Sequence, residues 1–181
     1  MTGIRTIGVI GAGQMGNGIA HVCALAGFDV VLNDVSADRL EAGIKTIQRN
    51  MERQVHRGMI SVEQRDAGMR RIKPVTTLDA FADVEFAIEA ATEKEAVKRA
   101  IFDEVCLKVP KTAMLATNTS SISITRLGAA TDRPERFIGL HFMNPVPLMK
   151  LVEVIRGLAT DQQTYDAAVH IVERLGKHVT N

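Results

Sequence analysis

The sequence predicts an α/β fold, a doubly wound and mostly parallel sheet with helices on both faces. Short apolar strand patterns alternate with amphipathic helix patterns along all 181 residues, and no internal repeat interrupts them. The first strand, helix and strand fit within about thirty residues, the size of a βαβ unit. A chain of this length forms one core, so we predict a single domain over residues 1–181.

The first βαβ unit covers residues 4–34. Residues 4–10 are rich in β-branched side chains and run into glycines, which predicts a buried strand. Residues 14–26 carry apolar side chains at helical spacing, Gly27 stands where a C-terminal cap is expected, and residues 28–34 form the second strand. Such units build parallel sheets with right-handed crossovers.

Two helices are predicted between the second and third strands. One begins at Ser36, because apolar side chains recur three or four positions apart after it, and a shorter one begins at Ser61, whose SVEQ sequence is a capping box. A minimal crossover needs one helix, so residues 36–73 are expected to form a helical-hairpin excursion from the core. Excursions of this kind often carry substrate contacts.

The central part of the chain continues the alternation of strands and helices. Strands are predicted at residues 73–77, 84–91 and 113–119. A helix over residues 93–109 lies between the last two, with the box TEKE at its start. These elements extend the parallel sheet.

The last two long strands are predicted to pair antiparallel. Residues 136–142 and 149–157 are separated by the turn-rich sequence MNPVPL, which is too short for a parallel crossover. The sheet is therefore expected to have an antiparallel edge. A helix from the box TDQQ to Gly176 and a short strand within residues 177–181 complete the predicted fold.

Composition and charge exclude several function classes. The 22 Lys and Arg residues balance 21 Asp and Glu residues, so no global basic field indicates a nucleic-acid partner. The two cysteines, Cys23 and Cys106, fall in helix patterns and indicate neither a disulfide framework nor a metal site. The N-terminus has no leader pattern and no apolar stretch of about 18 residues follows, so we expect a cytoplasmic protein without a membrane partner.

The sequence GAGQMG at residues 11–16 has the spacing of a dinucleotide-binding turn. The first glycine allows a tight turn, the second lets a pyrophosphate approach the backbone, and the third lets the helix pack closely on the strand. The same spacing fits a turn that binds nothing, but its place between a strand and a helix favours a Rossmann-like cofactor site. We therefore predict cofactor contacts for the whole turn: Gly11, Ala12, Gly13, Gln14, Met15 and Gly16.

Asp34 stands eighteen residues after the turn, at the end of the second predicted strand. Its carboxylate can accept hydrogen bonds from an adenosine ribose and would repel a 2′-phosphate, and no arginine follows until Arg39. NAD is thus favoured over NADP. The alternative is a turn residue that precedes the Ser36 cap.

His141 and Glu153 are predicted to lie opposite each other. If the two late strands fold about Pro147, opposite partners have numbers that sum to about 294, which pairs these two residues. A carboxylate beside an imidazole fixes its tautomer and stabilises the imidazolium, as an acid–base catalyst requires. The same pairing would satisfy a buried structural histidine, so the residues alone leave both roles open.

The hydroxyls and amide of residues 117–123 follow a predicted strand, at the edge where open α/β sheets bind ligands. They could hold a substrate oxygen, or they could cap the next short helix.

Taken in order, GVIGAGQMG, LND, IEAATEKEAVK, ATNTSSISI and GLHFMNPVPLMKLVEVI resemble the NAD-binding domain of the 3-hydroxyacyl-CoA dehydrogenase family. The resemblance covers nearly the whole chain, and the histidine block is its most specific part. It implies NAD as cofactor, an acyl-CoA substrate, and oxidation of the (S)-3-hydroxyl of a short chain, such as 3-hydroxybutyryl-CoA, or the reverse.

The resemblance also implies roles for individual residues. His141 would take the proton of the 3-hydroxyl, with Glu153 orienting it, while Ser120 and Asn144 would lie between substrate and nicotinamide. Glu93 and Lys98 match residues at the nicotinamide end of NAD. On one helix, five positions amount to about 140° of rotation, so spacing gives these last two no independent support.

In the family the helical excursion helps to hold coenzyme A. Residues 36–73 carry nine Lys or Arg against five Asp or Glu, a local charge of +4 that would attract a polyphosphate. The alternative is an ordinary solvated helix face. The candidate contacts recur every fourth residue: Lys45, Arg49, Arg53 and Arg57.

Members of the family continue into a helical C-terminal domain that closes the cleft and forms a homodimer, and this chain stops before it. We therefore expect residues 1–181 to fold and bind NAD with little turnover. Two other functions remain possible at this stage: a β-hydroxyacid dehydrogenase of the 6-phosphogluconate or 3-hydroxyisobutyrate type, and a non-catalytic NAD-binding module.

Overall fold

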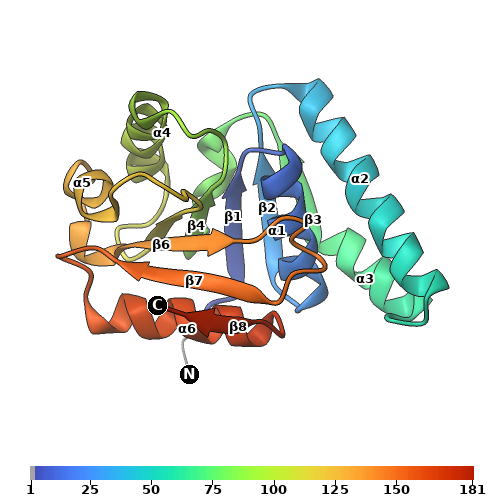
Figure 1. Ribbon diagram of the computed structural model, residues 1–181. Helices are drawn as coiled ribbons and strands as arrows, with labels where there is room; N and C mark the ends of the chain where they lie inside the picture. The colour runs from blue at the N-terminus through green and yellow to red at the C-terminus, as the bar shows by residue number, and fades with distance from the viewer. Residues whose placement is uncertain (1–2) are drawn as a thin grey trace.

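The computed structural model describes residues 3–181 and contains one eight-stranded sheet, in the order β3-β2-β1-β4-β5-β6-β7-β8 (Figure 1). Neighbouring strands are parallel from β3 to β6, β7 is antiparallel to β6, and β8 is parallel to β7. The predicted antiparallel edge is thus confirmed and consists of two strands. The strands are β1 (Thr6–Ile10), β2 (Asp29–Asn33), β3 (Ile72–Val75), β4 (Phe86–Glu89), β5 (Met114–Thr117), β6 (Phe137–Phe142), β7 (Leu151–Arg156) and β8 (His178–Thr180).

Helices cover both faces of the sheet, as a doubly wound fold requires. One face packs against α1, α2 and α6, and the other against α4, α5 and the short helix η1. Strand side chains alternate between the two faces, so Val9 belongs to the first core and Ile10 to the second. The helices are α1 (Gln14–Leu25), α2 (Ala37–His56), α3 (Val62–Arg71), η1 (Leu78–Phe81), α4 (Glu95–Lys108), α5 (Ile124–Ala129), η2 (Pro134–Arg136) and α6 (Gln162–Arg174).

The predicted helical hairpin over residues 36–73 is present as α2 and α3. Ser36 caps α2, and Ser61 and Gln64 form the predicted capping box of α3. In Figure 1, α2 runs past the sheet at one side of the molecule while α3 returns beneath it. Both pack on α1, and Ile47 and Met51 of α2 are fully buried, so the inner face of the excursion belongs to the core.

Two predicted helix starts are wrong. Helix α4 begins with Lys94 as its N-cap, because the Thr92 hydroxyl accepts from the Lys94 amide within the preceding turn. Helix α6 is capped by Asp161, since the Thr160 hydroxyl donates to the carbonyl oxygen of Phe137. In both cases the threonine of the expected box is used elsewhere, which sequence spacing does not reveal.

No helix within residues 3–181 is both long and apolar enough to cross a membrane. Cys23 and Cys106 are free, buried thiols, as their helix patterns predict. Burial raises the pKa of the Cys23 thiol to about 12, so this side chain is inert at neutral pH.

Candidate active site

The glycine turn lies between β1 and α1 with the geometry that a dinucleotide site needs. Gly11 has φ +103°, and a Cβ there would lie 2.7 Å from the Cα of Ala91. A Cβ at Gly16 would overlap the carbonyl oxygen of Gly11, so helix and strand pack as closely as the spacing predicts. A Cβ at Gly13 would meet nothing within 4 Å. The turn therefore leaves open space above Gly13, where a pyrophosphate can approach the backbone.

Asp34 follows β2 and is almost completely buried. Its Oδ2 accepts from the Ala12 amide at 3.0 Å, and its Oδ1 accepts from the Ser36 amide at 2.9 Å. Arg39, in the first turn of α2, also donates from Nε to Oδ1 at 3.2 Å. The carboxylate thus ties the glycine turn to the start of α2, and Arg39, the first arginine after Asp34 in the sequence, contacts it directly.

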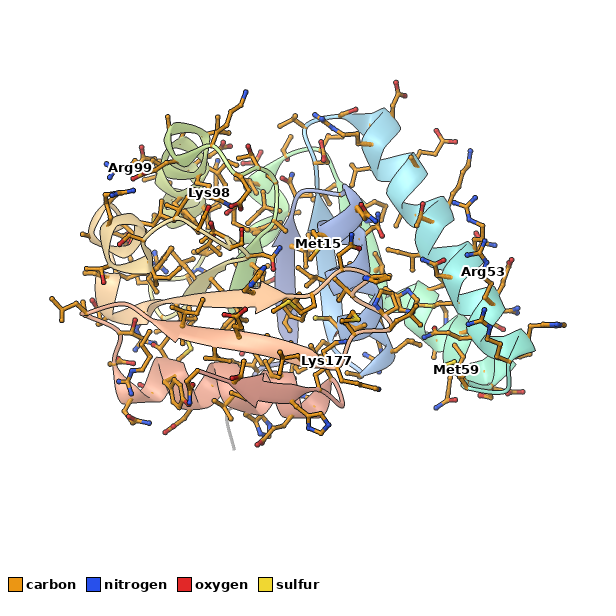
Figure 2. The ribbon with its side chains drawn as sticks, in the orientation of Figure 1. Met15, Arg53, Met59, Lys98, Arg99 and Lys177 are labelled. Atoms are coloured by element: carbon orange, nitrogen blue, oxygen red, sulfur yellow. The ribbon has the colours of Figure 1, made fainter. Side chains whose placement is uncertain are left out.

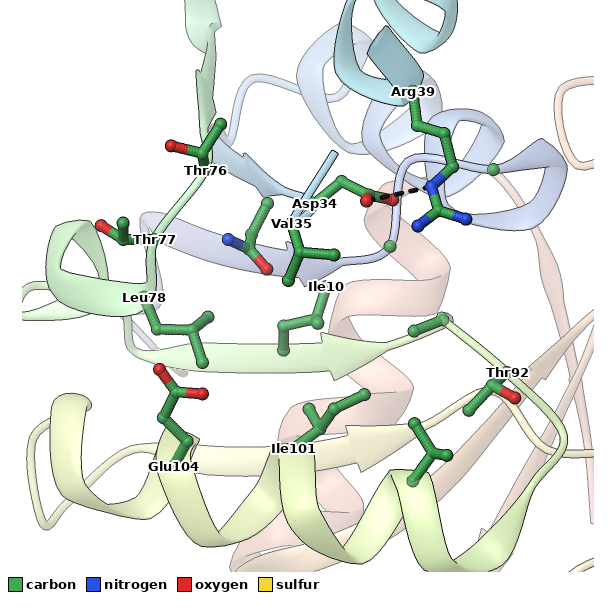
Figure 3. Close-up of a pocket in the computed structure, with 15 residues that line it drawn as sticks. Ile10, Asp34, Val35, Arg39, Thr76, Thr77, Leu78, Thr92, Ile101 and Glu104 are labelled. Atoms are coloured by element: carbon green, nitrogen blue, oxygen red, sulfur yellow. Dashed lines mark hydrogen bonds and ion pairs between the residues drawn. The ribbon is translucent and has the colours of Figure 1, made fainter. Parts of the chain in front are cut away.

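A cavity of about 360 Å³ lies beside Asp34 (Figure 3). Figure 3 shows Ile10, Leu78 and Ile101 facing it from β1, η1 and α4, with Asp34 and Arg39 at its rim. Apolar walls with a carboxylate at one end suit an adenosine, because the base is flat and apolar and its ribose carries hydroxyl donors. Val97 and Ile101 of α4 both line this cavity, and Ile101 also packs against the core.

Glu89 and Lys98 form a buried ion pair between the end of β4 and α4. Lys98 Nζ lies 2.6 Å from Glu89 Oε1 and 3.6 Å from Glu93 Oε1, and the Glu89 and Lys98 side chains are 0% and 1% exposed. Glu89 also accepts from the Thr117 hydroxyl and the Ala91 amide. Figure 2 shows Lys98 on the inner side of α4.

The helical-rotation argument against Glu93 and Lys98 is wrong. Glu93 precedes α4, which begins at Glu95, so the 140° rotation does not apply to this pair. Both residues line one surface hollow together with Gly13, Gln14 and Asn118, which connects them to the glycine turn.

The loop after β5 joins this hollow to the histidine strand. Asn118 Oδ1 accepts from the Phe142 amide at 2.8 Å, directly beside His141. The Thr119 hydroxyl donates to Glu93 Oε2 at 3.0 Å. Ser120 is exposed at this loop, whereas Ser123 caps α5, so the sequence TNTSSIS supplies both a candidate site residue and a helix cap.

His141 and Glu153 are direct partners in the β6–β7 ladder, as predicted. His141 Nδ1 and Glu153 Oε1 are 3.2 Å apart, and the two side chains are 22% and 39% exposed. With a proton on Nδ1 donated to the carboxylate, Nε2 carries a lone pair and can accept a proton. Partial exposure lets a ligand reach this ring, which a fully buried structural histidine would not allow.

The loop between β6 and β7, residues 143–150, is called the histidine loop. Asn144 connects it to the glycine turn, because Gln14 Nε2 donates to Asn144 Oδ1 at 3.2 Å. The loop is held from below by Lys177, whose Nζ donates to the carbonyl oxygens of Val146 and Met149. Burial lowers the pKa of Lys177. Helix α1 touches the same loop at Gly18, where a Cβ would lie 2.8 Å from the Cβ of Val146.

The candidate coenzyme A contacts on and after α2 lie in different surroundings. Arg53 and Arg57 line a cavity of about 230 Å³ that α2 forms with Pro145, Pro147 and Leu148 of the histidine loop. Figure 2 shows Arg53 and Met59 on the outer part of the excursion. Arg49 faces a neighbouring hollow, and Lys45 pairs with Glu41 at 2.9 Å. Of these four candidate residues, Arg53 and Arg57 therefore lie beside the loop that follows His141.

The fold and the turn define a Rossmann-type dinucleotide-binding domain, with a paired histidine at the same edge of the sheet. The sequence pattern described as "3-hydroxyacyl-CoA dehydrogenase, NAD binding domain" matches residues 6–181. The chain belongs to this family, and its cofactor is NAD.

Individual relatives agree with this assignment. A 3-hydroxybutyryl-CoA dehydrogenase of Bradyrhizobium diazoefficiens is 61% identical over 176 residues, which are 97% of this chain and 60% of the relative. The 3-hydroxyadipyl-CoA dehydrogenase of Escherichia coli is 42% identical over 98% of this chain and 37% of its own length. A crystal structure of (S)-3-hydroxybutyryl-CoA dehydrogenase from Ralstonia eutropha superposes with a TM-score of 0.95 and 42% identity, covering 97% of this chain and 62% of that one.

The chain thus spans about 60% of the length of the similar 3-hydroxybutyryl-CoA dehydrogenases. These comparisons favour this family over the 6-phosphogluconate type of dehydrogenase.

Two features of the site are not predicted by the sequence: the buried Glu89 and the contact between Arg39 and Asp34. The sequence around Glu89 could have indicated its role, because a lone carboxylate in the apolar stretch FAIEAA needs a buried partner. Asn118, which directly follows β5, belongs to the predicted group of residues 117–123, and the structure adds its hydrogen bond from the Phe142 amide. Nothing in the sequence around Arg39 indicates its contact with Asp34, since that contact depends on the direction of α2.

Proposed function

We propose that this chain is the NAD-binding part of an enzyme that oxidises (S)-3-hydroxyacyl-CoA to 3-oxoacyl-CoA, or catalyses the reverse, with short-chain substrates such as 3-hydroxybutyryl-CoA. The observation that carries the proposal is the His141–Glu153 pair beside the glycine turn. The names of the similar proteins support this substrate class.

In the oxidation, His141 Nε2 accepts the proton of the 3-hydroxyl while the C3–H bond breaks. Glu153 accepts the Nδ1 proton in a hydrogen bond and stabilises the imidazolium that forms. Bound NAD supplies the hydride acceptor. In the reverse direction the same imidazolium returns its proton to the carbonyl oxygen of the 3-oxo group.

Other residues position the reactants. Asn144 is oriented by Gln14 and would donate its amide to the oxygen at C3, with the Ser120 hydroxyl as a second donor from the β5 loop. Glu93, held by Thr119, Ser121 and Lys98, would contact the nicotinamide end of the cofactor. Lys98 lines the same hollow but its side chain is 1% exposed, so we propose that it acts on the cofactor mainly by holding Glu93.

The coenzyme A moiety would lie along α2. Arg53 and Arg57 line the cavity next to the histidine loop, and Arg49 extends the positive surface outward. Lys45 is a weaker candidate because Glu41 already neutralises it. The exposed Leu148 and Met59 offer apolar contacts at the same cavity.

The test is oxidation of NADH with acetoacetyl-CoA by the full-length protein and its His141→Ala variant. We expect turnover to fall by about two to four orders of magnitude with NADH affinity unchanged, since general acid–base catalysis contributes that much. Equal turnover in the two proteins would refute the role of His141. A protein that binds NADH but reduces only a free 3-oxo acid would refute the acyl-CoA substrate.

We also propose that residues 1–181 form a single domain. The whole protein, we propose, is a cytoplasmic homodimer without nucleic-acid or membrane partners. The buried free thiols support a reducing compartment. Light scattering on the full-length protein tests the dimer, and a monomer at micromolar concentration would contradict it.

A further inference from the structure

The ion pair between Arg39 and Asp34 lies at the rim of the adenosine cavity. Arg39 Nε is 3.2 Å from Asp34 Oδ1, and both residues line the cavity (Figure 3). The Arg39 side chain is 63% exposed, while that of Asp34 is 9% exposed. The carboxylate is therefore fixed in place, and the exposed guanidinium is anchored to it at one atom.

The hydrogen bonds of Asp34 leave little room for a ribose. An ionised carboxylate has about four acceptor positions, and the Ala12 amide, the Ser36 amide and Arg39 Nε occupy three of them. Within residues 3–181 the two Nη atoms of Arg39 make no hydrogen bond. A ribose that uses both carboxylate oxygens must therefore displace Arg39, whose Nε and Nη groups then face the ligand.

A 2′-phosphate would meet opposing charges at this rim. The negative groups that line the cavity are Asp34 and Glu104, and Asp38 adds a further negative charge in the first turn of α2. The positive groups are the Arg39 guanidinium and the N-terminal amides of the 20-residue helix α2, which Ser36 caps. Asp34 is the only one of the acids that is hydrogen-bonded to Arg39, so it both repels a phosphate and occupies the donor that would bind it.

We propose that Arg39 is a second determinant of dinucleotide specificity, held by Asp34 and able to bind a 2′-phosphate once that carboxylate is neutralised. Wild-type preference for NAD thus comes from Asp34 in two ways, by direct repulsion and by sequestering Arg39. One substitution at Asp34 is therefore expected to shift the cofactor preference toward the 2′-phosphate, because Arg39 already lies at this rim.

Binding of 2′,5′-ADP and of 5′-AMP, measured by calorimetry on residues 1–181, tests the proposal without requiring turnover. The ratio of the two affinities reports the 2′-phosphate alone. The variants are Asp34→Asn, Arg39→Gln and the double variant. Asparagine keeps an acceptor for the Ala12 amide, and Asp34→Ser is a second variant if the first one unfolds. Arg65→Gln, on α3 and paired with Asp66, is the matched control.

We expect Asp34→Asn to shift the affinity ratio toward 2′,5′-ADP by about tenfold, and this shift to disappear in the double variant and to shrink in high salt. Arg65→Gln should leave the ratio unchanged. If the double variant keeps the whole shift, or if neither Asp34 variant shifts the ratio while both remain folded, the proposal is wrong. Failure of the wild-type chain to bind NADH or 5′-AMP would overturn both this proposal and the placement of the cofactor.

Discussion

Two acid–base pairs lie at the same edge of the sheet, and their surroundings differ sharply. Glu89 and Lys98 are 0% and 1% exposed, and their Nζ and Oε1 atoms are 2.6 Å apart. His141 and Glu153 are 22% and 39% exposed, with Nδ1 and Oε1 3.2 Å apart. The first pair is enclosed by protein groups, and the second leaves one ring nitrogen accessible. A buried, fully bonded pair fixes positions, whereas a half-exposed pair can exchange a proton with a ligand.

The two pairs also differ in what depends on them. Glu89 bonds to Thr117 at the end of β5 and to the Ala91 amide beside Gly11, so it joins β4, β5 and α4 at the ligand edge. Glu153 bonds only to His141 among its side-chain contacts in residues 3–181. We therefore expect substitutions in the first pair to change stability and substitutions in the second pair to change turnover.

The largest effect is expected for Lys98→Met. Removing the ammonium leaves the Glu89 carboxylate buried and unpaired, which costs about 3–5 kcal/mol in the free energy of unfolding. Urea denaturation followed by circular dichroism measures it. The double variant Glu89→Gln/Lys98→Met should recover part of the loss, because the amide oxygen still accepts from Thr117 and no charge remains. A loss below about 1 kcal/mol for Lys98→Met would contradict the assignment of this pair as structural.

Glu153→Gln should show the opposite profile. The imidazolium loses its carboxylate, so kcat with acetoacetyl-CoA is expected to fall about 10- to 100-fold while KM and NADH affinity stay within about twofold. Because the pair is half-exposed, the free energy of unfolding should change by less than about 1 kcal/mol. A stability loss as large as that of Lys98→Met, with kcat unchanged, would reverse the comparison.

A smaller effect is expected when His21 is substituted. This second histidine differs from His141 in its surroundings. His21 is fully buried, its Nε2 lies 2.8 Å from Gln54 Oε1, and its Nδ1 has no partner among residues 3–181. Burial is the main cause that lowers its pKa below the usual 6.5, and the charge of Lys177 adds to it. His21 is thus the core imidazole of this chain, and His141 is the candidate catalytic one.

The sign of the pH effect at His21 follows from this lowered pKa. The unfolded chain binds the proton first, so the stability that His21 contributes is complete above about pH 6.5 and is lost as the pH falls below it, by at most about 1.4 kcal/mol per pH unit. His21→Gln should flatten the decrease in unfolding free energy between pH 7.5 and 5.5. The exposed His178→Gln is the control and should leave the slope unchanged. An equal slope in wild type and His21→Gln would show that His21 is not buried in its neutral form.

The sequence by itself determined the order of strands and helices, the glycine turn and the register of the histidine hairpin. These depend on short-range patterns: alternating apolar residues, capping residues such as Ser36 and Ser61, and a loop too short for a crossover. The pairing of His141 with Glu153 could be predicted for the same reason, because an antiparallel ladder fixes partners by residue number alone.

The tertiary structure decided which of these groups meet other parts of the chain. The spacing of residues in the sequence does not predict that Lys98 lies near Glu93 or that Arg39 contacts Asp34. Nor does it predict that Arg53 and Arg57 line a cavity beside the histidine loop. Nor could it tell the buried His21 from the accessible His141, since both occur among apolar residues. Such contacts depend on where each helix starts and how it packs on the sheet, and side chains from segments distant in sequence come together only once the whole fold has formed.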